Sequence, residues 1–199
     1  MTTAGGRGPQ MWDERYGAAE RVWSSGPNRE VDRIVAGWVP GRALDLGAGE
    51  GRHALWLAEK GWQVTAVDFS AVGIDRGRRE AERRGLAVDW VVDDVTTWHP
   101  PEGTAFDLVL VAYLHIPEDV FSRLGRWLAP GGALVVVGHA LRNLTEGVGG
   151  PQDPALLHTT EQLLAAAQDL DVERCEEVLR STDAGDAIDV VLVARRPAG

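Results

Sequence analysis

The sequence feature that most constrains the fold is a turn with three alternating glycines, Asp45-Leu46-Gly47-Ala48-Gly49-Glu50-Gly51-Arg52, after the short run at residues 42–44. Glycines of this kind can adopt positive φ angles and leave the main chain bare, so a ligand can lie against it. Residues 53–60 carry their apolar side chains at helical spacing. The turn therefore leads from a strand into a helix, whose N-terminus favours electron-rich groups beside the ligand.

A second acidic position indicates that the ligand is a nucleoside. Asp68 ends the strand-like residues 63–68, and a carboxylate at the tip of the second strand of such a unit binds the hydroxyls of a ribose. The turn differs from the dinucleotide fingerprint, which requires a glycine where this chain has Arg52. The sequence therefore predicts a nucleoside-cofactor site that is not of the usual NAD type.

The pattern Asp-x-Gly-x-Gly-x-Gly at residues 45–51 resembles motif I of the class I S-adenosylmethionine-dependent methyltransferases. Three later segments resemble the same family: residues 91–95, the buried strand at 105–112 (its motif IV), and the helix-turn-strand element at 128–137. The resemblance covers residues 39–139. It implies S-adenosylmethionine as the cofactor and a Rossmann-like fold.

The resemblance also implies roles for individual residues. Asp45 would position the methionine amino group, Asp94 would accept a hydrogen bond from the adenine amino group, and the Val95 amide would meet a ring nitrogen. The full set of cofactor-binding residues expected from the N-terminal segment, the glycine turn and the strand ends is Trp12, Tyr16, Trp23, Asp45, Gly47, Ala48, Gly49, Gly51, Asp68, Phe69, Asp93, Asp94, Val95 and Ala112.

The order of elements predicts an α/β fold. Helices are expected over residues 10–19, 29–39, 53–60, 70–84, 117–128 and 159–170, and strands over 42–46, 63–68, 87–92, 105–112, 133–139, 172–179 and 187–195. Alternating strands and helices give a doubly wound, mostly parallel sheet of seven strands in a single domain, with an antiparallel last strand. Residues 1–9 are expected to form a flexible tail and residues 10–199 the domain.

Two segments outside the motifs are candidates for covering the site. The N-terminal helical region at 10–40 contains Trp12, Tyr16 and Trp23, which either close over the cofactor or pack as core. This region is similar to that of small-molecule methyltransferases of the tellurite-resistance and thiopurine type. The long loop at 140–158 is either a substrate-facing lid or a structural loop packed on the sheet edge.

Composition narrows the partners and the compartment. Acidic residues outnumber basic ones 30 to 20, giving a net charge of −10, and the arginines at 76–84 alternate with acids, so a nucleic-acid surface is not expected. No segment approaches the roughly 18 apolar residues that cross a membrane. One cysteine and an N-terminus without an apolar core indicate a cytoplasmic protein. The sequence leaves the oligomeric state open.

The candidate catalytic residues follow the fourth and fifth strands. A general base is needed only where the acceptor still carries its proton, and His115 is the first candidate, His139 the second, with Tyr113 orienting the substrate. A structural role for each histidine stays open. The histidines show no helical pairing and no cysteine cluster occurs, so no metal site is expected.

These observations predict an S-adenosylmethionine-dependent methyltransferase that acts on a small molecule. Two alternatives remain. A non-catalytic protein could bind the same cofactor without a pocket beyond its methyl group. A nicotinamide-dependent oxidoreductase is disfavoured, because the chain lacks the third fingerprint glycine and a Tyr-x-x-x-Lys motif, with Lys60 its single lysine. The sequence leaves the acceptor atom open.

Overall fold

The computed structural model describes residues 8–18, 26–116 and 118–199. The chain divides into two compact units, Met1–His99 and Pro100–Gly199. The expected mixed sheet of seven strands is confirmed, in the order β3-β2-β1-β4-β5-β7-β6. Trp23 and most of the expected N-terminal tail lie outside the described residues.

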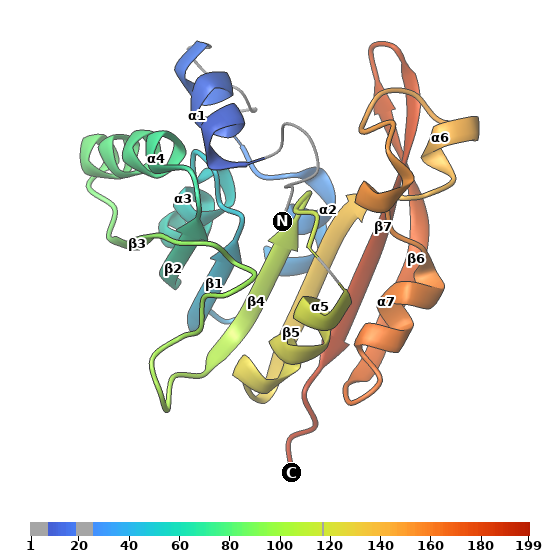
Figure 1. Ribbon diagram of the computed structural model, residues 1–199. Coiled ribbons are helices and arrows are strands. Elements are labelled where there is room, and N and C mark those ends of the chain that lie inside the picture. The colour runs from blue at the N-terminus through green and yellow to red at the C-terminus, as the bar shows by residue number, and fades with distance from the viewer. Residues whose placement is uncertain (1–7, 19–25, 117) are drawn as a thin grey trace. The chain divides into compact units, whose positions relative to one another are not determined.

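The first unit is built on three parallel strands (Figure 1). The strand β1 pairs with β2, and β2 pairs with β3. Its elements are α1 (Pro9–Ala18), α2 (Arg29–Val35), β1 (Arg42–Leu46), α3 (Arg52–Glu59), β2 (Gln63–Asp68), α4 (Ala71–Arg84) and β3 (Val88–Val92). Residues Ala43–Leu46 of β1 are all buried, so buried and exposed side chains do not alternate along this strand. This is expected for a parallel strand that is covered on both faces.

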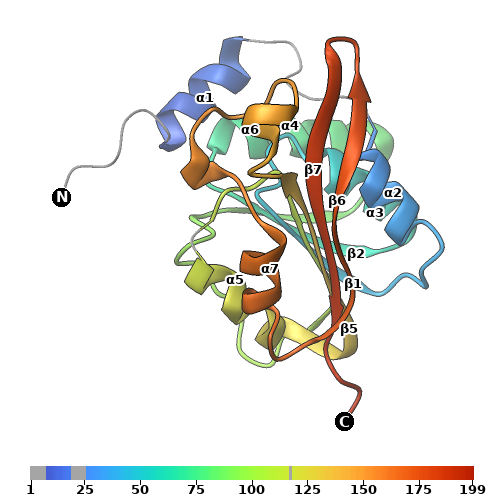
Figure 2. The ribbon, with the colours of Figure 1, turned by 90° about the vertical axis from the view of Figure 1, so that its right-hand side faces the viewer.

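The second unit contains a long antiparallel hairpin (Figure 2). Its elements are β4 (Phe106–Ala112), α5 (Glu118–Leu124), a 3-10 turn (Gly125–Trp127), β5 (Leu128–His139), α6 (Asn143–Glu146), a second 3-10 turn (Pro154–Leu156), α7 (Thr160–Ala166), β6 (Asp171–Thr182) and β7 (Gly185–Arg195). β4 and β5 are parallel, and β7 lies between β5 and β6, antiparallel to both. α5 and α7 pack side by side.

Local capping signals placed the helix starts correctly. The Asn28 side chain accepts hydrogen bonds from the backbone N–H groups of Glu30 (2.8 Å) and Val31 (3.4 Å) at the start of α2. Thr159 and Gln162 form the expected capping box of α7. In each case a polar side chain satisfies backbone donors that the first helical turn leaves without a partner.

Several expected boundaries were wrong. The helix expected over 29–39 ends at Val35, because Gly37 and the approach to Pro40 disfavour helical backbone. α7 ends at Ala166 and not near residue 170. The helix expected to reach 128 ends at Leu124, and β5 already begins at Leu128.

The early start of β5 has a backbone cause. Gly131 donates to the carbonyl of Arg196 (3.0 Å), and Arg196 donates back to Gly132 (2.9 Å). A Cβ atom at Gly132 would lie 2.6 Å from the Phe106 carbonyl oxygen. These close approaches extend the strand pairing through the glycine pair, which sequence periodicity alone had assigned to a turn.

The indole of Trp90 on β3 fixes the packing of the glycine turn against α4. A Cβ atom at Gly51 would lie 2.3 Å from Trp90 Cη2, and one at Gly77, in α4, would lie 2.5 Å from the same atom. Gly51 also has a φ of 78° as the N-cap of α3. The third glycine of the turn is therefore needed for side-chain packing between a strand and two helices as well as for backbone conformation.

We expect Gly77→Ala to destabilise the protein by about 1–3 kcal/mol in urea unfolding, because the added methyl group overlaps the Trp90 indole. The sign of this change in unfolding free energy is informative, because alanine in a helix is ordinarily favoured over glycine by roughly 0.5–1 kcal/mol. Gly37→Ala is the control, as no atom lies within 4 Å of the place its methyl group would occupy. Equal stabilities of Gly77→Ala and the unmodified protein would contradict this packing.

Candidate functional site

The glycine turn is closed by backbone hydrogen bonds from its own residues. The N–H groups of Gly47 (2.8 Å) and Ala48 (3.1 Å) donate to the Val67 carbonyl, and Gly51 donates to Ala48 (2.8 Å). All three glycines have positive φ, at 71°, 56° and 78° for Gly47, Gly49 and Gly51. The turn thus ties the end of β1 to the end of β2 before α3 begins.

The carboxylate of Asp68 joins the glycine turn to the start of α4. Its Oδ2 accepts a hydrogen bond from the Gly49 N–H (2.9 Å), and its Oδ1 accepts one from the Ser70 N–H (2.8 Å). Burial raises the pKa of Asp68, and these two backbone donors partly oppose that rise. Each oxygen keeps a second lone pair, so the carboxylate can still accept hydrogen bonds from ligand hydroxyls.

Asp45, at the end of β1, carries a buried oxygen with no partner. Its Oδ2 is without a hydrogen bond among the described residues, although the side chain is only 1% exposed. Burial raises the pKa of Asp45 to about 7, against a hydrogen bond from the Ala54 backbone that lowers it. A buried carboxyl oxygen without a partner costs about 1–3 kcal/mol. A cationic or hydrogen-bond-donating ligand would remove that cost.

The helix α1 is attached to the start of α4. Ser70, the N-cap of α4, donates its hydroxyl to Asp13 Oδ1 (2.5 Å), and the Val72 N–H donates to the same oxygen (3.2 Å). Tyr16 is buried, and a Cβ atom at Gly73 would lie 3.1 Å from both its ring and the Gly49 backbone. The N-terminal helix therefore packs beside Asp68 and the glycine turn.

The two aromatic residues of α1 contact each other, and a cation covers one of them. The Trp12 and Tyr16 ring centroids are 5.6 Å apart, and the Arg15 guanidinium lies 5.0 Å from the Trp12 centroid. Tyr16 packs as core, and Trp12 is half-buried. The expected packing as core therefore describes Tyr16, and closure over the cofactor stays a prediction for Trp12. Trp23 lies outside the described residues.

The acidic pair after β3 forms a turn of its own. The Asp93 N–H donates to the Asp68 carbonyl (3.1 Å), which connects the ends of β2 and β3. Asp94 Oδ1 accepts from the N–H (2.8 Å) and hydroxyl (2.7 Å) of Thr96. Asp93 and Asp94 are exposed and Val95 is buried. One Asp94 oxygen is therefore committed to shaping the turn, which leaves Oδ2 to accept from another donor.

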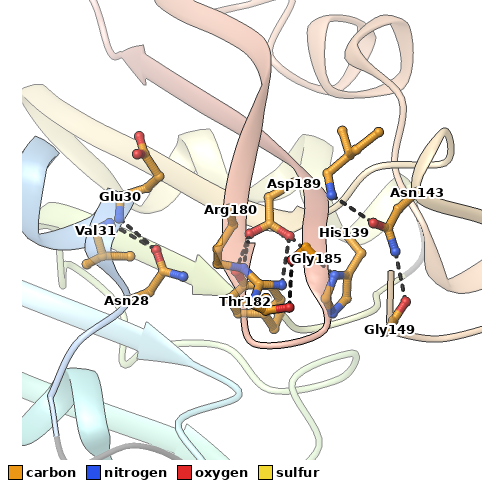
Figure 3. Close-up of polar contacts among 12 residues, drawn as sticks. Asn28, Glu30, Val31, His139, Asn143, Gly149, Arg180, Thr182, Gly185 and Asp189 are labelled. Atoms are coloured by element: carbon orange, nitrogen blue, oxygen red, sulfur yellow. Dashed lines mark hydrogen bonds and ion pairs between the residues drawn. The ribbon is translucent and has the colours of Figure 1, made fainter. Parts of the chain in front are cut away.

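In the second unit, polar side chains gather around Asp189 on β7 (Figure 3). Asp189 Oδ2 accepts from the Tyr113 hydroxyl (2.5 Å) and from Arg180 Nε (2.7 Å). His139 Nδ1 lies 3.3 Å from Asp189 Oδ1 and makes no hydrogen bond among the described residues. Tyr113 and His139 are two of the three expected catalytic candidates, and their rings are 4.8 Å apart.

The third candidate, His115, lies with another histidine. Its ring is stacked on that of His158 at 6.1 Å, and Phe121 meets His158 edge-on at 5.3 Å. Burial lowers the pKa of His158, so this imidazole is neutral at pH 7. Ala112, the remaining expected cofactor residue of this unit, is buried at the end of β4 and pairs with Val137.

The loop at 140–158 is anchored to β7. The Asn143 side chain accepts from the Ile188 N–H (2.7 Å) and donates to the Gly149 carbonyl (2.8 Å). Ala140 and His158 form an isolated parallel bridge. These contacts attach the loop to β7, which is an interior strand of the sheet.

Residues whose contacts are with residues distant in the sequence were not identified by the sequence analysis. Asp13 contacts α4 across 57 positions, and Asp189 and Arg180 meet Tyr113 across more than 60. Arg180 and Asp189 sit in the expected last two strands, but no local motif marks them. A charged residue at an inward-facing position of a buried strand was the only available signal, and Asp189 in Ile188–Val193 has it.

Comparison with known proteins agrees with this geometry. Residues 43–132 match the family described as a methyltransferase domain. This part of the chain is therefore similar to a methyltransferase domain. The fold of the chain is that of the N-methyltransferase NodS of Bradyrhizobium japonicum solved with S-adenosyl-L-homocysteine, at a TM-score of 0.71 and 20% identity, covering 95% of this chain and 98% of that one.

Two curated relatives have methyltransferase names. The demethylmenaquinone methyltransferase of Thermus thermophilus is 37% identical over 62% of this chain and 60% of the relative. The tRNA 5-carboxymethoxyuridine methyltransferase of Escherichia coli is 34% identical over 53% of this chain and 44% of the relative. The methyltransferase domain therefore spans only about half the length of these relatives.

We also searched the described residues for metal-binding clusters and for helices that could span a membrane. No group of three or more His, Cys, Asp or Glu side chains that could hold a metal occurs within residues 8–18, 26–116 and 118–199. In the same ranges, no helix is both long and apolar enough to cross a membrane.

We expect Asp13→Ala to loosen α1, because the substitution removes the acceptor of the Ser70 hydroxyl and the Val72 N–H. A lost cap of this kind costs about 1 kcal/mol. Limited proteolysis should then cleave near α1 several times faster than in the unmodified protein. Glu14→Ala, an exposed change in the same helix, is the matched control. Equal cleavage rates in the two variants would argue against the Asp13 attachment.

Proposed function

We propose that this protein transfers the methyl group of S-adenosylmethionine to a small-molecule acceptor. The observation that carries the proposal is the buried, unpartnered Oδ2 of Asp45 at the glycine turn, beside the Asp68 carboxylate. S-adenosylmethionine has an ammonium group that could pair with Asp45 and ribose hydroxyls that could donate to Asp68. Its sulfur also carries an electrophilic methyl group. The similarity to a methyltransferase domain supports this assignment.

The residues of the first unit fit such a cofactor. Asp45 would bind the methionine ammonium, and Asp68 would accept hydrogen bonds from the ribose hydroxyls through the lone pairs that Gly49 and Ser70 leave available. Gly47, Ala48, Gly49 and Gly51 would provide the backbone surface. Phe69, Asp93, Asp94 and Val95 would flank the adenine, with Asp94 Oδ2 as the acceptor, since Oδ1 already serves Thr96. Trp12 and Tyr16 of α1 would cover the site.

Charge supports a small acceptor over a nucleic acid. The net charge is −10, and arginines of α4 form ion pairs: Arg76 with Glu50 (2.8 Å), Arg79 with Asp75 (2.6 Å), and Arg83 and Arg84 with Glu80 (2.8 and 2.6 Å). The carboxylate partners offset the positive charge that a phosphate-binding surface would need. The relative from Thermus thermophilus is named for demethylmenaquinone, which is a small molecule.

The relative from Escherichia coli, named for a tRNA nucleoside, supports a second candidate, a tRNA substrate. A nucleic-acid substrate would bind with an affinity that falls steeply with salt, whereas a neutral small molecule would not. Binding of tRNA measured between about 50 and 200 mM salt separates the two. A loss of two or more orders of magnitude in affinity over this range would favour the nucleic acid.

The cofactor is tested by calorimetric titration with S-adenosylmethionine, S-adenosylhomocysteine and NAD. We expect the first two to bind and NAD not to bind. Asp45→Asn tests the cofactor site more specifically than a substitution of Asp68 would. Asp68 also accepts hydrogen bonds from Gly49 and Ser70, so its loss would disturb the turn itself. Asp169→Asn, an exposed change, is the matched control. Binding of NAD alone, or of none of the three, would refute the proposal.

The affinity for S-adenosylmethionine should depend on pH through Asp45. Because burial raises its pKa to about 7, a proton must leave Asp45 below that pH before the carboxylate can pair with the ammonium. The dissociation constant should therefore rise by up to about tenfold for each pH unit below 7 and stay nearly constant above it. Asp45→Asn should bind weakly with little pH dependence. A flat profile in the unmodified protein would rule out this role for Asp45.

A further inference from the structure

The cluster around Asp189 is set by the pairing of β5 with β7. His139 and Asp189 are direct cross-strand partners in that antiparallel ladder, so their side chains leave the same face of the sheet. Arg180 comes from the neighbouring strand β6 (Figure 3). Tyr113 directly follows the last residue of β4. The meeting of these side chains is therefore fixed by strand register and does not depend on a flexible segment.

The carboxylate of Asp189 is ionised, and its two oxygens have different partners. The side chain is 1% exposed, and burial alone would disfavour its charge. The contacts with His139, Arg180 and Tyr113 outweigh burial and lower the pKa of Asp189. Oδ2 is taken by Tyr113 and Arg180 Nε, whereas Oδ1 has only Arg180 Nη2 at 3.4 Å and His139 Nδ1 at 3.3 Å. Oδ1 therefore has capacity left for an N–H of His139.

Tyr113 holds this arrangement at a cost in backbone energy. Its φ is 56°, the only positive value for a non-glycine residue within the described ranges. Such a conformation costs on the order of 1–3 kcal/mol and persists only where surrounding contacts fix it. Here the hydroxyl donates to Asp189 and the backbone N–H donates to the Val137 carbonyl (2.7 Å). Strain concentrated beside a buried charged cluster is typical of functional sites.

The glycine-rich part of the 140–158 loop covers one edge of His139. A Cβ atom at Gly150 would lie 3.2 Å from both Cε1 and Nδ1 of His139, so only glycine allows this approach without displacement. Asn143 holds the preceding residue, Gly149, through its carbonyl (2.8 Å). His139 Nδ1 is fully buried and has no hydrogen bond among the described residues, and Asp189 Oδ1 lies 3.3 Å from it. The side chain as a whole is 14% exposed.

We propose that Asp189 is a positioning residue that holds His139 as the Nδ1–H tautomer, so that His139 Nε2 accepts the proton of a hydroxyl-bearing methyl acceptor. This inference rests on the proposed function and names its substrate class. A carboxylate cannot donate, so its only favourable contact with Nδ1 is one in which Nδ1 carries the hydrogen. The other ring nitrogen is then left with its lone pair available as a base.

The proton balance of the transfer requires such a group when the acceptor is a hydroxyl. A carbon–oxygen bond forms to the methyl group, the carbon–sulfur bond breaks with its electron pair going to sulfur, and the hydroxyl proton goes to Nε2 of His139 and from there to solvent. An acceptor that is already ionised, such as a thiolate, needs no base. The cluster is therefore expected to matter for hydroxyl acceptors and not for thiolates.

The surroundings of His139 fit the role of a positioned base more closely than those of His115. His115 stacks on the imidazole of His158, whereas His139 has the Asp189 carboxylate 3.3 Å from its Nδ1. His139 was the second candidate from the sequence. The order of the two candidates is reversed by Asp189, which no sequence motif indicated.

The first test reads the tautomer of His139 without any substrate. Long-range nitrogen–hydrogen correlation spectra of labelled protein at about pH 8.5, two units above the reference pKa of histidine, distinguish Nδ1–H from Nε2–H. We expect Nδ1–H in the unmodified protein. In Asp189→Asn the amide oxygen stays with Tyr113 and Arg180, so the NH2 group faces Nδ1 and the tautomer should change to Nε2–H.

Two variants complete this test. Asp186→Asn, on the exposed end of the same strand, is the matched control and should leave the His139 tautomer unchanged. His139→Gln identifies the resonance among the five histidines. An Nε2–H tautomer in the unmodified protein, or an unchanged tautomer in Asp189→Asn, would overturn the positioning role.

The second test uses phenol and thiophenol as acceptor probes with S-adenosylmethionine, measuring S-adenosylhomocysteine. His139→Gln and Asp189→Asn should slow phenol methylation by about 10²–10⁴-fold and change thiophenolate methylation by less than about threefold. Equal losses with both probes, or an unchanged phenol rate, would overturn the base role. A protein that fails to bind S-adenosylmethionine in calorimetry would refute the proposed function, and the tautomer result would still decide the positioning of His139.

Discussion

The first unit is organised by one carboxylate, that of Asp68. By accepting the N–H of Gly49 and of Ser70, it fixes the glycine turn and the start of α4 relative to each other. Ser70 in turn caps α4 and reaches Asp13 of α1, and the backbone of Asp68 receives the N–H of Asp93. Three strand ends and the N-terminal helix therefore depend on hydrogen bonds that begin at one residue.

Two buried carboxyl groups show how partners decide charge. Asp45 and Asp189 are both almost inaccessible to solvent, yet burial raises the pKa of Asp45 to about 7, and the contacts of Asp189 lower its pKa despite burial. The difference lies in the donors: Asp45 Oδ2 has none among the described residues, and Asp189 has a tyrosine, an arginine and a histidine around it. An unsatisfied carboxyl is suited to receiving a cationic ligand, and a satisfied one to holding a neighbour in place.

The parts of this structure that were predictable from sequence are those set by local rules. Glycine spacing, strand hydrophobicity and the caps at Asn28 and Thr159 act over a few residues, and they located the turn and the order of the elements. The strand pairing that places Asp189 opposite His139 depends on insertion of β7 between β5 and β6 and on a register shared across some fifty residues. Residue spacing along the chain does not specify that register, so the contact between Asp189 and His139 was not predictable.

What could be predicted differs between the two tasks of a methyltransferase, which are binding the cofactor and binding the methyl acceptor. The family match ends at residue 132, and every member of the Asp189 cluster except Tyr113 lies beyond it. A cofactor that is common to a family can be bound by a common motif, because its ammonium, ribose and adenine do not vary. An acceptor varies, so the groups that bind and deprotonate it belong to strands and loops whose sequences are free to diverge. A shared motif can thus identify the methyl donor, whereas under the proposed function the acceptor is inferred from contacts such as those of His139 and Asp189.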